Sequence, residues 1–147
     1  MIYLDTSALI KRFVNEKGSS LVQSLVEQRE PVATAKIAYA EIFADFARKL
    51  RAGHLPRNSY ALACRQFERD WNGYVRVDLR DDVLFSARDL IQRHPLKGFD
   101  AVHLASALSL KNALGEKITF AAADKRLLQA AMAEKLEPLN VETASVR

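Results

Sequence analysis

Short apolar segments alternate with longer segments of helical periodicity along nearly the whole chain, and this alternation restricts the possible folds more than any other feature. Four segments have the length and composition of buried strands: residues 1–5, 31–35, 74–79 and 117–124. Strands that alternate with helices form a parallel sheet with helices on both faces, so the sequence predicts an α/β fold. The tail from Pro138 adds a candidate edge strand.

Capping residues, glycines and prolines mark where the predicted helices begin and end. The expected helices cover residues 6–16, 19–26, 37–51, 56–71, 81–94, 100–114 and 124–136. In the fourth of these, apolar side chains recur every three or four residues. They are Tyr60, Cys64, Phe67 and Trp71. We interpret this stripe as a packing face and not as a surface for stacking nucleic-acid bases.

The composition is that of an ordinary globular protein, and the length fits one domain, residues 1–147. Cys64 is the only cysteine, so we expect neither an internal disulfide nor a Cys-rich zinc site. We recognise no secretory signal and no membrane-spanning apolar run, and we expect a cytoplasmic protein. The net charge of +4 permits binding to a polyanion but does not require it.

Three aspartates stand where ligands of parallel sheets bind. Asp5 and Asp124 each end a predicted strand, so both project into the crevice outside the carboxyl ends of the strands. Asp100 lies in the first turn of a predicted helix, among the apolar residues Phe99 and Ala101. Taken singly, Asp5 and Asp124 are better explained as helix caps, and Asp100 is explained by the helix dipole.

Glu41 has no such explanation, because it lies well inside a predicted helix that is mostly apolar around it. A carboxylate in that setting is costly unless it is paired or bound to a cation. An ion pair with Arg48 is the main structural alternative to a functional role. Asp45 is the only other acid on this helix that could take the place of Glu41.

Considered together, the four acids predict a metal site. If they share one crevice, each pair repels by roughly 3 kcal/mol at about 5 Å with an effective dielectric constant near 20. Such a cluster either holds protons or binds hard divalent cations. Oxygen ligands without cysteine or clustered histidine favour Mg²⁺ or Mn²⁺ over zinc. Metal ions held by acids are suited to hydrolysis of phosphodiester bonds.

Four blocks in this order resemble the PIN-domain nucleases, and most closely the VapC-like toxins of type II toxin–antitoxin pairs. The blocks are YLDTSAL, AEI, FDAVHLASAL and ADKRLL, and the resemblance extends from Met1 to about Leu139. It implies a three-layer α/β/α domain with a central parallel sheet of about five strands. It also implies Mg²⁺- or Mn²⁺-dependent endoribonuclease activity on RNA, a homodimer and a cognate antitoxin protein.

The resemblance also assigns roles to the acids. Asp5 and Asp100 would be the principal metal ligands, Glu41 would help to orient metal-bound water, and Asp124 would be the fourth acid. One position departs from the family pattern: Ala122 stands where a hydroxyl residue is frequent, which puts the role of Asp124 in doubt.

Other polar residues near these blocks have two interpretations each. Ser7 either bonds an acid or water of the site or only caps a helix, and His103 is read more simply as a packed polar residue than as an acid catalyst. Seven cations close to the acids in sequence are candidate phosphate contacts, although each taken singly is better explained as solvated surface: Lys11, Arg12, Lys36, Arg48, Lys97, Lys125 and Arg126.

Two other functions compete with an RNA-cleaving toxin. A nuclease for structured DNA would need clamps for which 147 residues leave no room. A catalytically idle module that binds RNA or a protein would have no reason to collect carboxylates that repel one another. The acids therefore favour the nuclease.

Overall fold

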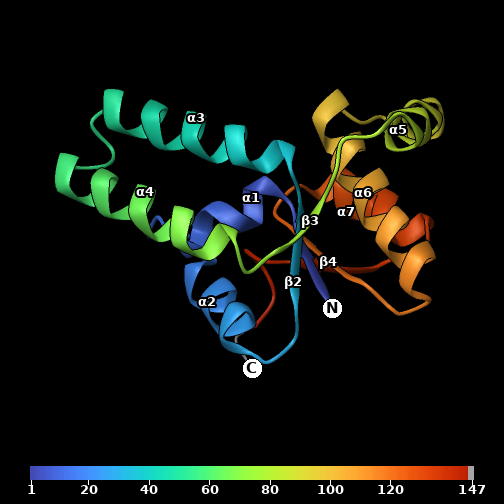
Figure 1. The fold of residues 1–147 in the computed structure, drawn as a ribbon, viewed down its shortest axis with the longest axis horizontal. Helices are drawn as coiled ribbons and strands as arrows, with labels where there is room; N and C mark the ends of the chain where they lie inside the picture. Colours follow the sequence, from blue (N-terminus) through green and yellow to red (C-terminus); the bar gives the residue numbers. More distant parts are fainter. Residues whose placement is uncertain (146–147) are drawn as a thin grey trace.

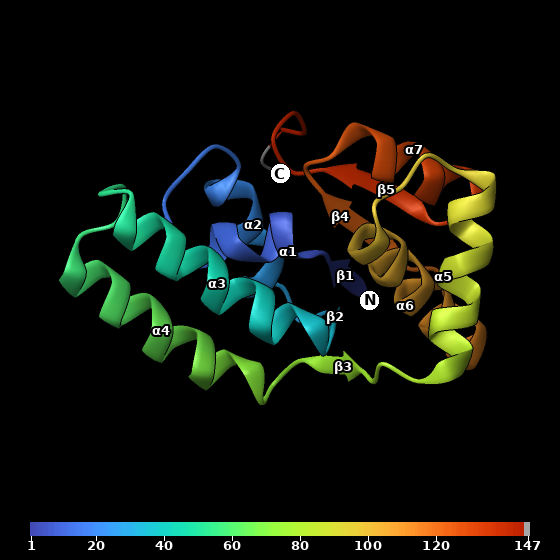
Figure 2. The ribbon, with the colours of Figure 1, turned by 90° about the horizontal axis from the view of Figure 1, so that it is seen from above.

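A five-stranded parallel sheet forms the centre of the protein in a computed structural model that describes residues 1–145. Its strands are β1 (Ile2–Leu4), β2 (Val32–Ala35), β3 (Val75–Val77), β4 (Thr119–Ala122) and β5 (Glu137–Asn140). They are arranged in the order β3-β2-β1-β4-β5 and pair in parallel throughout. Figure 2 shows β3 and β5 at opposite edges of this sheet. The predicted parallel sheet is confirmed, including an edge strand formed by the tail.

Helices cover both faces of the sheet, as Figure 1 shows. Those on one face are α1 (Thr6–Leu9), α2 (Ser19–Glu27), α3 (Ile37–Arg51) and α4 (Arg57–Trp71); those on the other are α5 (Asp81–Arg93), α6 (Gly98–Leu114) and α7 (Lys125–Ala133). The three-layer α/β/α architecture predicted from the resemblance is confirmed. None of the helices within residues 1–145 is long and apolar enough to span a membrane.

The alternation of side chains along the strands explains why both faces are covered. Ile2 and Leu4 are buried in the core that the sheet forms with α1–α4, whereas Tyr3 between them is buried in the core with α5–α7. On this second face the Tyr3 ring stacks on that of Phe120 from the adjacent strand β4, with 5.3 Å between the ring centroids. A strand that is apolar on both faces must be covered on both.

The aromatic stripe of α4 packs as predicted. Phe67 and Trp71 are buried, and the Phe67 ring stacks on Phe43 and meets Phe46 edge-on, both from α3. These contacts hold α3 and α4 side by side. The prediction of a packing face is confirmed.

One predicted helix is broken. Residues 6–16 form only the short helix α1 and a 3₁₀ turn over Ile10–Arg12. At this turn Lys11, although only 5% exposed, is paired with Glu16 at 3.0 Å and with Glu142 at 3.2 Å. Gly18 then makes a close approach: its φ is +92°, and a Cβ atom there would lie 2.6 Å from the carbonyl oxygen of Val141.

We expect the Gly18→Ala substitution to lower the free energy of unfolding by about 2–4 kcal/mol, because it adds a backbone clash to an unfavourable φ. Gly115→Ala is the matched control, since Gly115 also has a positive φ of +66° but no atom within 4 Å of a Cβ. That control should cost only about 1 kcal/mol. Urea denaturation measures both values, and equal losses would contradict the role of the Val141 contact.

Candidate functional site

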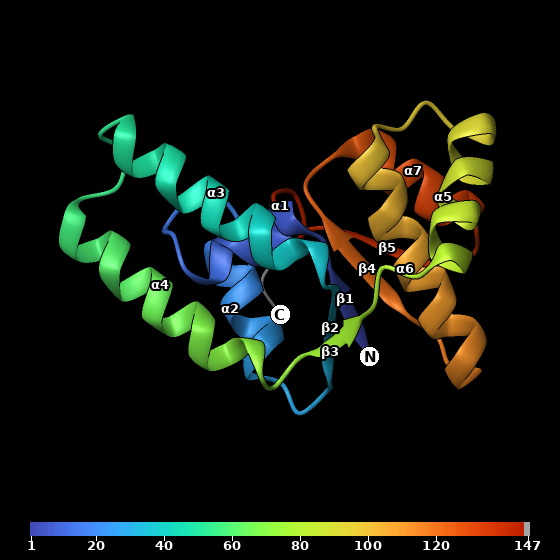
Figure 3. The same cartoon turned by 45° about the horizontal axis from the view of Figure 1, so that its top comes forward.

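The four predicted acids lie at the carboxyl edge of the sheet, each on a different element. Asp5 directly follows β1, and Asp124 lies two residues after β4. Glu41 is in α3, which begins just after β2, and Asp100 is in the first turn of α6. Figure 3 shows the beginnings of α3 and α6 at this same edge. The topology therefore brings together residues separated by more than one hundred positions.

Asp5 is an almost fully buried carboxylate, with 3% exposure. Its Oδ1 accepts hydrogen bonds from the Ala8 amide at 2.9 Å and the Ser7 hydroxyl at 2.7 Å, so Asp5 is indeed the N-cap of α1. Burial raises the pKa of Asp5 to about 6, the nearby Asp100 adds to this effect, and His103 and the two hydrogen-bond donors oppose it. Its second oxygen makes no hydrogen bond in the described part of the chain.

Ser7 joins two strand ends at this site. Its hydroxyl donates to Asp5 and accepts a hydrogen bond from the backbone amide of Ala123 at 3.0 Å. The residue that follows is Asp124, which caps α7 by accepting from the Leu127 amide. Of the two interpretations of Ser7, the structure selects the bond to the acid. Ser7 thus ties the position of one acid to the segment that carries another.

Glu41 is bound by side chains of two other elements and not by Arg48. Its Oε1 accepts hydrogen bonds from Thr6 Oγ1 at 2.7 Å and from His103 Nε2 at 2.8 Å. Burial raises the pKa of Glu41, but these two hydrogen bonds and the proximity of His103 outweigh burial and hold that pKa below its usual value. Arg48 pairs instead with Asp45. The structural alternative for Glu41 is therefore wrong.

His103 has a larger part in the site than its sequence context indicated. It is 1% exposed on α6, and its Nδ1 lies 2.7 Å from the hydroxyl of Tyr3 in β1. Because a carboxylate only accepts, His103 donates from Nε2 to Glu41, and its Nδ1 shares a hydrogen bond with the Tyr3 hydroxyl. A buried chain of hydrogen bonds thus runs from the core of the sheet to an acid of the site. The only sequence signal was a histidine one turn after Asp100.

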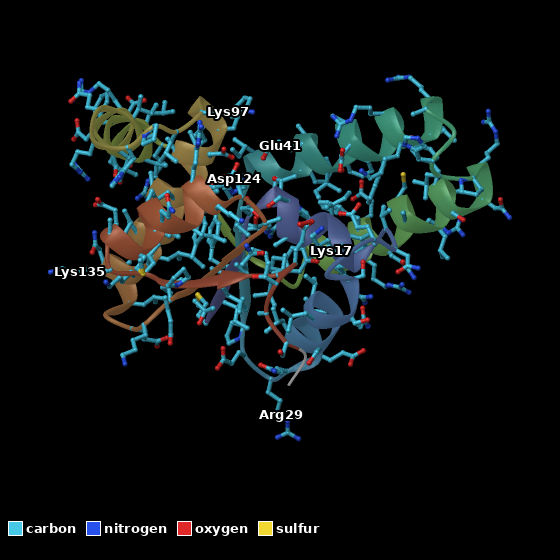
Figure 4. All side chains as sticks on the ribbon, turned by 180° about the vertical axis from the view of Figure 1, so that it is seen from behind. Lys17, Arg29, Glu41, Lys97, Asp124 and Lys135 are labelled. Atoms are coloured by element: carbon cyan, nitrogen blue, oxygen red, sulfur yellow. The ribbon has the colours of Figure 1, made fainter. Side chains whose placement is uncertain are left out.

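Asp100 and Asp124 line one hollow of about 320 Å³, together with Lys97, Lys125 and Arg126. Burial raises the pKa of the half-buried Asp100, and the charges of Asp124 and Glu41 raise it further, against His103 and Lys97. Asp100 accepts no hydrogen bond within residues 1–145. Figure 4 shows Asp124, Lys97 and Glu41 at the same end of the molecule.

The candidate phosphate contacts separate into two groups. Lys11, Arg12, Lys36 and Arg48 are all engaged in ion pairs with acids outside the site. In contrast, Lys97, Lys125 and Arg126 are exposed at the acidic hollow and form no ion pair in the described chain. Only this second group could bind a phosphate without breaking another interaction.

The donor set suits a hard cation that is only partly coordinated by protein. Within the described residues, no three His, Cys, Asp or Glu side chains form a ready-made metal site. Mg²⁺ does not need one, since it usually binds one or two carboxylates and completes its shell with water and substrate phosphate. Asp5 and Asp100 each offer an unbonded carboxylate oxygen, and a cation would relieve the unfavourable burial of both charges.

Comparison with known proteins identifies the family of this chain. Residues 2–133 match the PIN domain family. The chain belongs to that family. Among PIN-domain relatives, Ribonuclease VapC45 and Ribonuclease VapC49, from two strains of Mycobacterium tuberculosis, are each 36% identical over 110 residues, which is 75% of this chain and 76% of theirs. The resemblance to VapC-like PIN-domain nucleases is therefore confirmed.

Two solved structures share the PIN-domain fold. A toxin–antitoxin complex from Klebsiella pneumoniae contains a chain with a TM-score of 0.67 and 16% identity, and the match covers 96% of this chain and 98% of that one. FitAcB from Neisseria gonorrhoeae gives a TM-score of 0.68 at 16% identity, over 98% of this chain and 100% of that one. At such identities the likeness concerns the fold alone.

Proposed function

We propose that this chain is an endoribonuclease that hydrolyses RNA phosphodiester bonds with Mg²⁺ or Mn²⁺, as the toxin of a type II toxin–antitoxin pair. The observation that carries the proposal is the gathering of four acids at the carboxyl edge of the sheet, beside three cations free of ion pairs in the described chain. Membership of the PIN domain family and the names of the VapC ribonucleases support RNA as the substrate.

In this proposal Asp5 and Asp100 are the principal metal ligands, and Asp124 is the fourth acid. When bound, the metal ion makes water more acidic and stabilises the charge that develops on the scissile phosphate. Glu41 receives both of its hydrogen bonds on Oε1, from Thr6 and His103, so its Oε2 has a fixed direction and would help to orient the attacking water.

The cations around the acids bind the substrate. Lys97, Lys125 and Arg126 lie around the hollow that contains Asp100 and Asp124, so they attract the phosphates that flank the scissile bond. Without them the acids would repel RNA. The three cations around the acids thus allow RNA, a polyanion, to bind over a group of carboxylates.

The test is cleavage of total cellular RNA by the purified chain, with the cut ends mapped by sequencing. We expect defined cuts with Mn²⁺ or Mg²⁺, no cuts in EDTA, and full recovery when excess Mn²⁺ is added back, because the carboxylates alone supply no Lewis acid. Cutting that persists in EDTA would contradict metal dependence. RNA binding without cutting in any metal would favour the idle binding module instead.

The partners follow from the same proposal. The Klebsiella pneumoniae chain comes from a toxin–antitoxin complex, which supports an antitoxin for this chain, acting on it in the cytoplasm. We also propose a homodimer; exposed apolar side chains such as Leu114 and Met132 offer surface for protein contacts. Sedimentation of the purified chain, alone and coexpressed with the product of an adjacent short gene, measures both assemblies.

A further inference from the structure

A second hollow, of about 890 Å³, opens beside the acids between α3, α5 and α6. Glu41 and Asp100 line it on one side. Lys97 and Asp100 line both this hollow and the smaller one that contains Asp124, so the two hollows are adjacent. The volume is within the range of roughly 300–1,000 Å³ that small-molecule sites occupy. A molecule bound at the acids would therefore have room to extend into it.

The walls of this hollow are apolar although they face solvent. Leu84 and Ile91 of α5 are 41% and 44% exposed. Phe99 of α6, which directly precedes Asp100, is 63% exposed. Single exposed apolar side chains are ordinary, but three that line one hollow indicate a binding surface. The phenylalanine is the largest of them and the nearest in sequence to a proposed metal ligand.

We infer that this hollow binds a nucleobase of the RNA, from a nucleotide next to the scissile phosphate, and that the base stacks on Phe99. The inference rests on the proposed function and adds the contact that positions the substrate. Its apolar walls suit the faces of a base, and Lys97 at the same hollow, which forms no ion pair in the described chain, suits a phosphate attached to that nucleotide. An interface with another protein would not require apolar walls and a free cation to lie directly beside the acids of the site.

Stacking on Phe99 places a requirement on the nucleotide beside the cut. A base reaches an aromatic side chain of the protein only if it is free of its own helical stack, and this occurs in loops, bulges and ends. Stacking on one ring tolerates all four bases. Phe99 is therefore expected to select unpaired RNA more strongly than any particular sequence.

The first measurement is the affinity for a fluorescein-labelled single-stranded RNA that contains one mapped cleavage site. Fluorescence anisotropy measures the binding, in EDTA so that the RNA is not cleaved. Stacking is worth roughly 1–3 kcal/mol per base, so Phe99→Ala should raise Kd about 5- to 140-fold. Phe99→Trp keeps an aromatic face and should bind like the natural chain. Leu62→Ala is the control, because Leu62 is 47% exposed on α4, outside both hollows.

The second measurement removes bases one at a time from the RNA, as abasic sites on either side of the cut. One abasic position should weaken binding to the natural chain by the same factor as Phe99→Ala, and should have no further effect on the Phe99→Ala variant. This loss of additivity identifies a direct contact between that base and that ring. Circular dichroism verifies that the variant is folded.

Several results would overturn the inference. Unchanged affinity of the Phe99→Ala variant, additive effects of the variant and every abasic site, or no RNA binding by the natural chain would each do so. A change in sedimentation with unchanged RNA affinity would assign the hollow to contact between protein chains. Failure of the proposed function is separate, because it requires that the natural chain cut no RNA with Mn²⁺, whereas this inference is measured by binding without metal.

Discussion

The Asp100→Asn substitution is expected to lower the rate of RNA cleavage by about 10³-fold or more while the protein stays folded. Asp100 accepts no hydrogen bond within residues 1–145, so replacing one of its oxygens by an amide group breaks no structural contact. The variant loses a negatively charged metal ligand. A metal ion that stabilises phosphate charge contributes several kcal/mol to the transition state, and about 4 kcal/mol corresponds to a factor of 10³ in rate. Single-turnover cleavage of a defined RNA measures the effect.

Asp81→Asn is the matched control for this experiment. Asp81 is also an aspartate in the first turn of a helix, but it is exposed at the start of α5 and lines neither hollow. Its cleavage rate should equal that of the natural chain. If Asp100→Asn cleaved as fast as this control, Asp100 would only stabilise the first turn of α6. It would then not be a metal ligand, as the proposed mechanism requires.

The Asp5→Asn substitution is expected to stabilise the metal-free protein at neutral pH and to abolish cleavage. The folded pKa of Asp5 is about 6, against an ordinary value of 3.8. The folded state therefore binds this proton more tightly, so the stability that Asp5 contributes is complete below about pH 4 and is lost as the pH rises through 6. The difference amounts to about 3 kcal/mol. Asparagine carries no charge and can still accept from Ser7 and Ala8 as an N-cap.

Urea denaturation in EDTA at pH 4 and pH 7.5 tests this expectation. The variant and the natural chain should have similar free energies of unfolding at pH 4, and the variant should be the more stable at pH 7.5. Asp124→Asn serves as the control, because Asp124 is an exposed N-cap whose charge is not buried. If Asp5→Asn were destabilising at both pH values, its carboxylate would have a structural role that outweighs the cost of burial.

Local sequence patterns predicted where the acids lie in the fold, but they did not predict the hydrogen bonds that the acids make. Asp5 and Asp124 were placed correctly because a strand end that is also a helix start is recognisable from a few neighbouring residues. For these aspartates, capping a helix is compatible with belonging to the site, since a cap uses one carboxylate oxygen and leaves the other free to bind a ligand. Glu41 was singled out because a carboxylate contradicts its apolar sequence neighbours, and it stays a predicted site residue.

Contacts between distant segments could not be read in this way. The bonds of His103 to Tyr3 and Glu41 depend on the packing of α6 against β1 and α3, which no local pattern encodes. The buried Lys11 after α1 is likewise paired with Glu142, which lies far along the chain. The hollow beside Phe99 exists only because α5 and α6 pack together at a particular distance. Residues that act through long-range geometry gave only weak signals in the sequence.

The order of the strands has a consequence for synthesis of the chain. β1 lies between β2 and β4, and Asp5, among the first residues to be made, meets Asp124 only after β4 has paired with β1. His103, which holds Glu41, also comes from the last third of the chain. A ribosome that makes this protein therefore carries an incomplete acidic centre until translation is nearly finished. On the proposed function, the chain therefore acquires its cleaving activity only when its synthesis is almost complete.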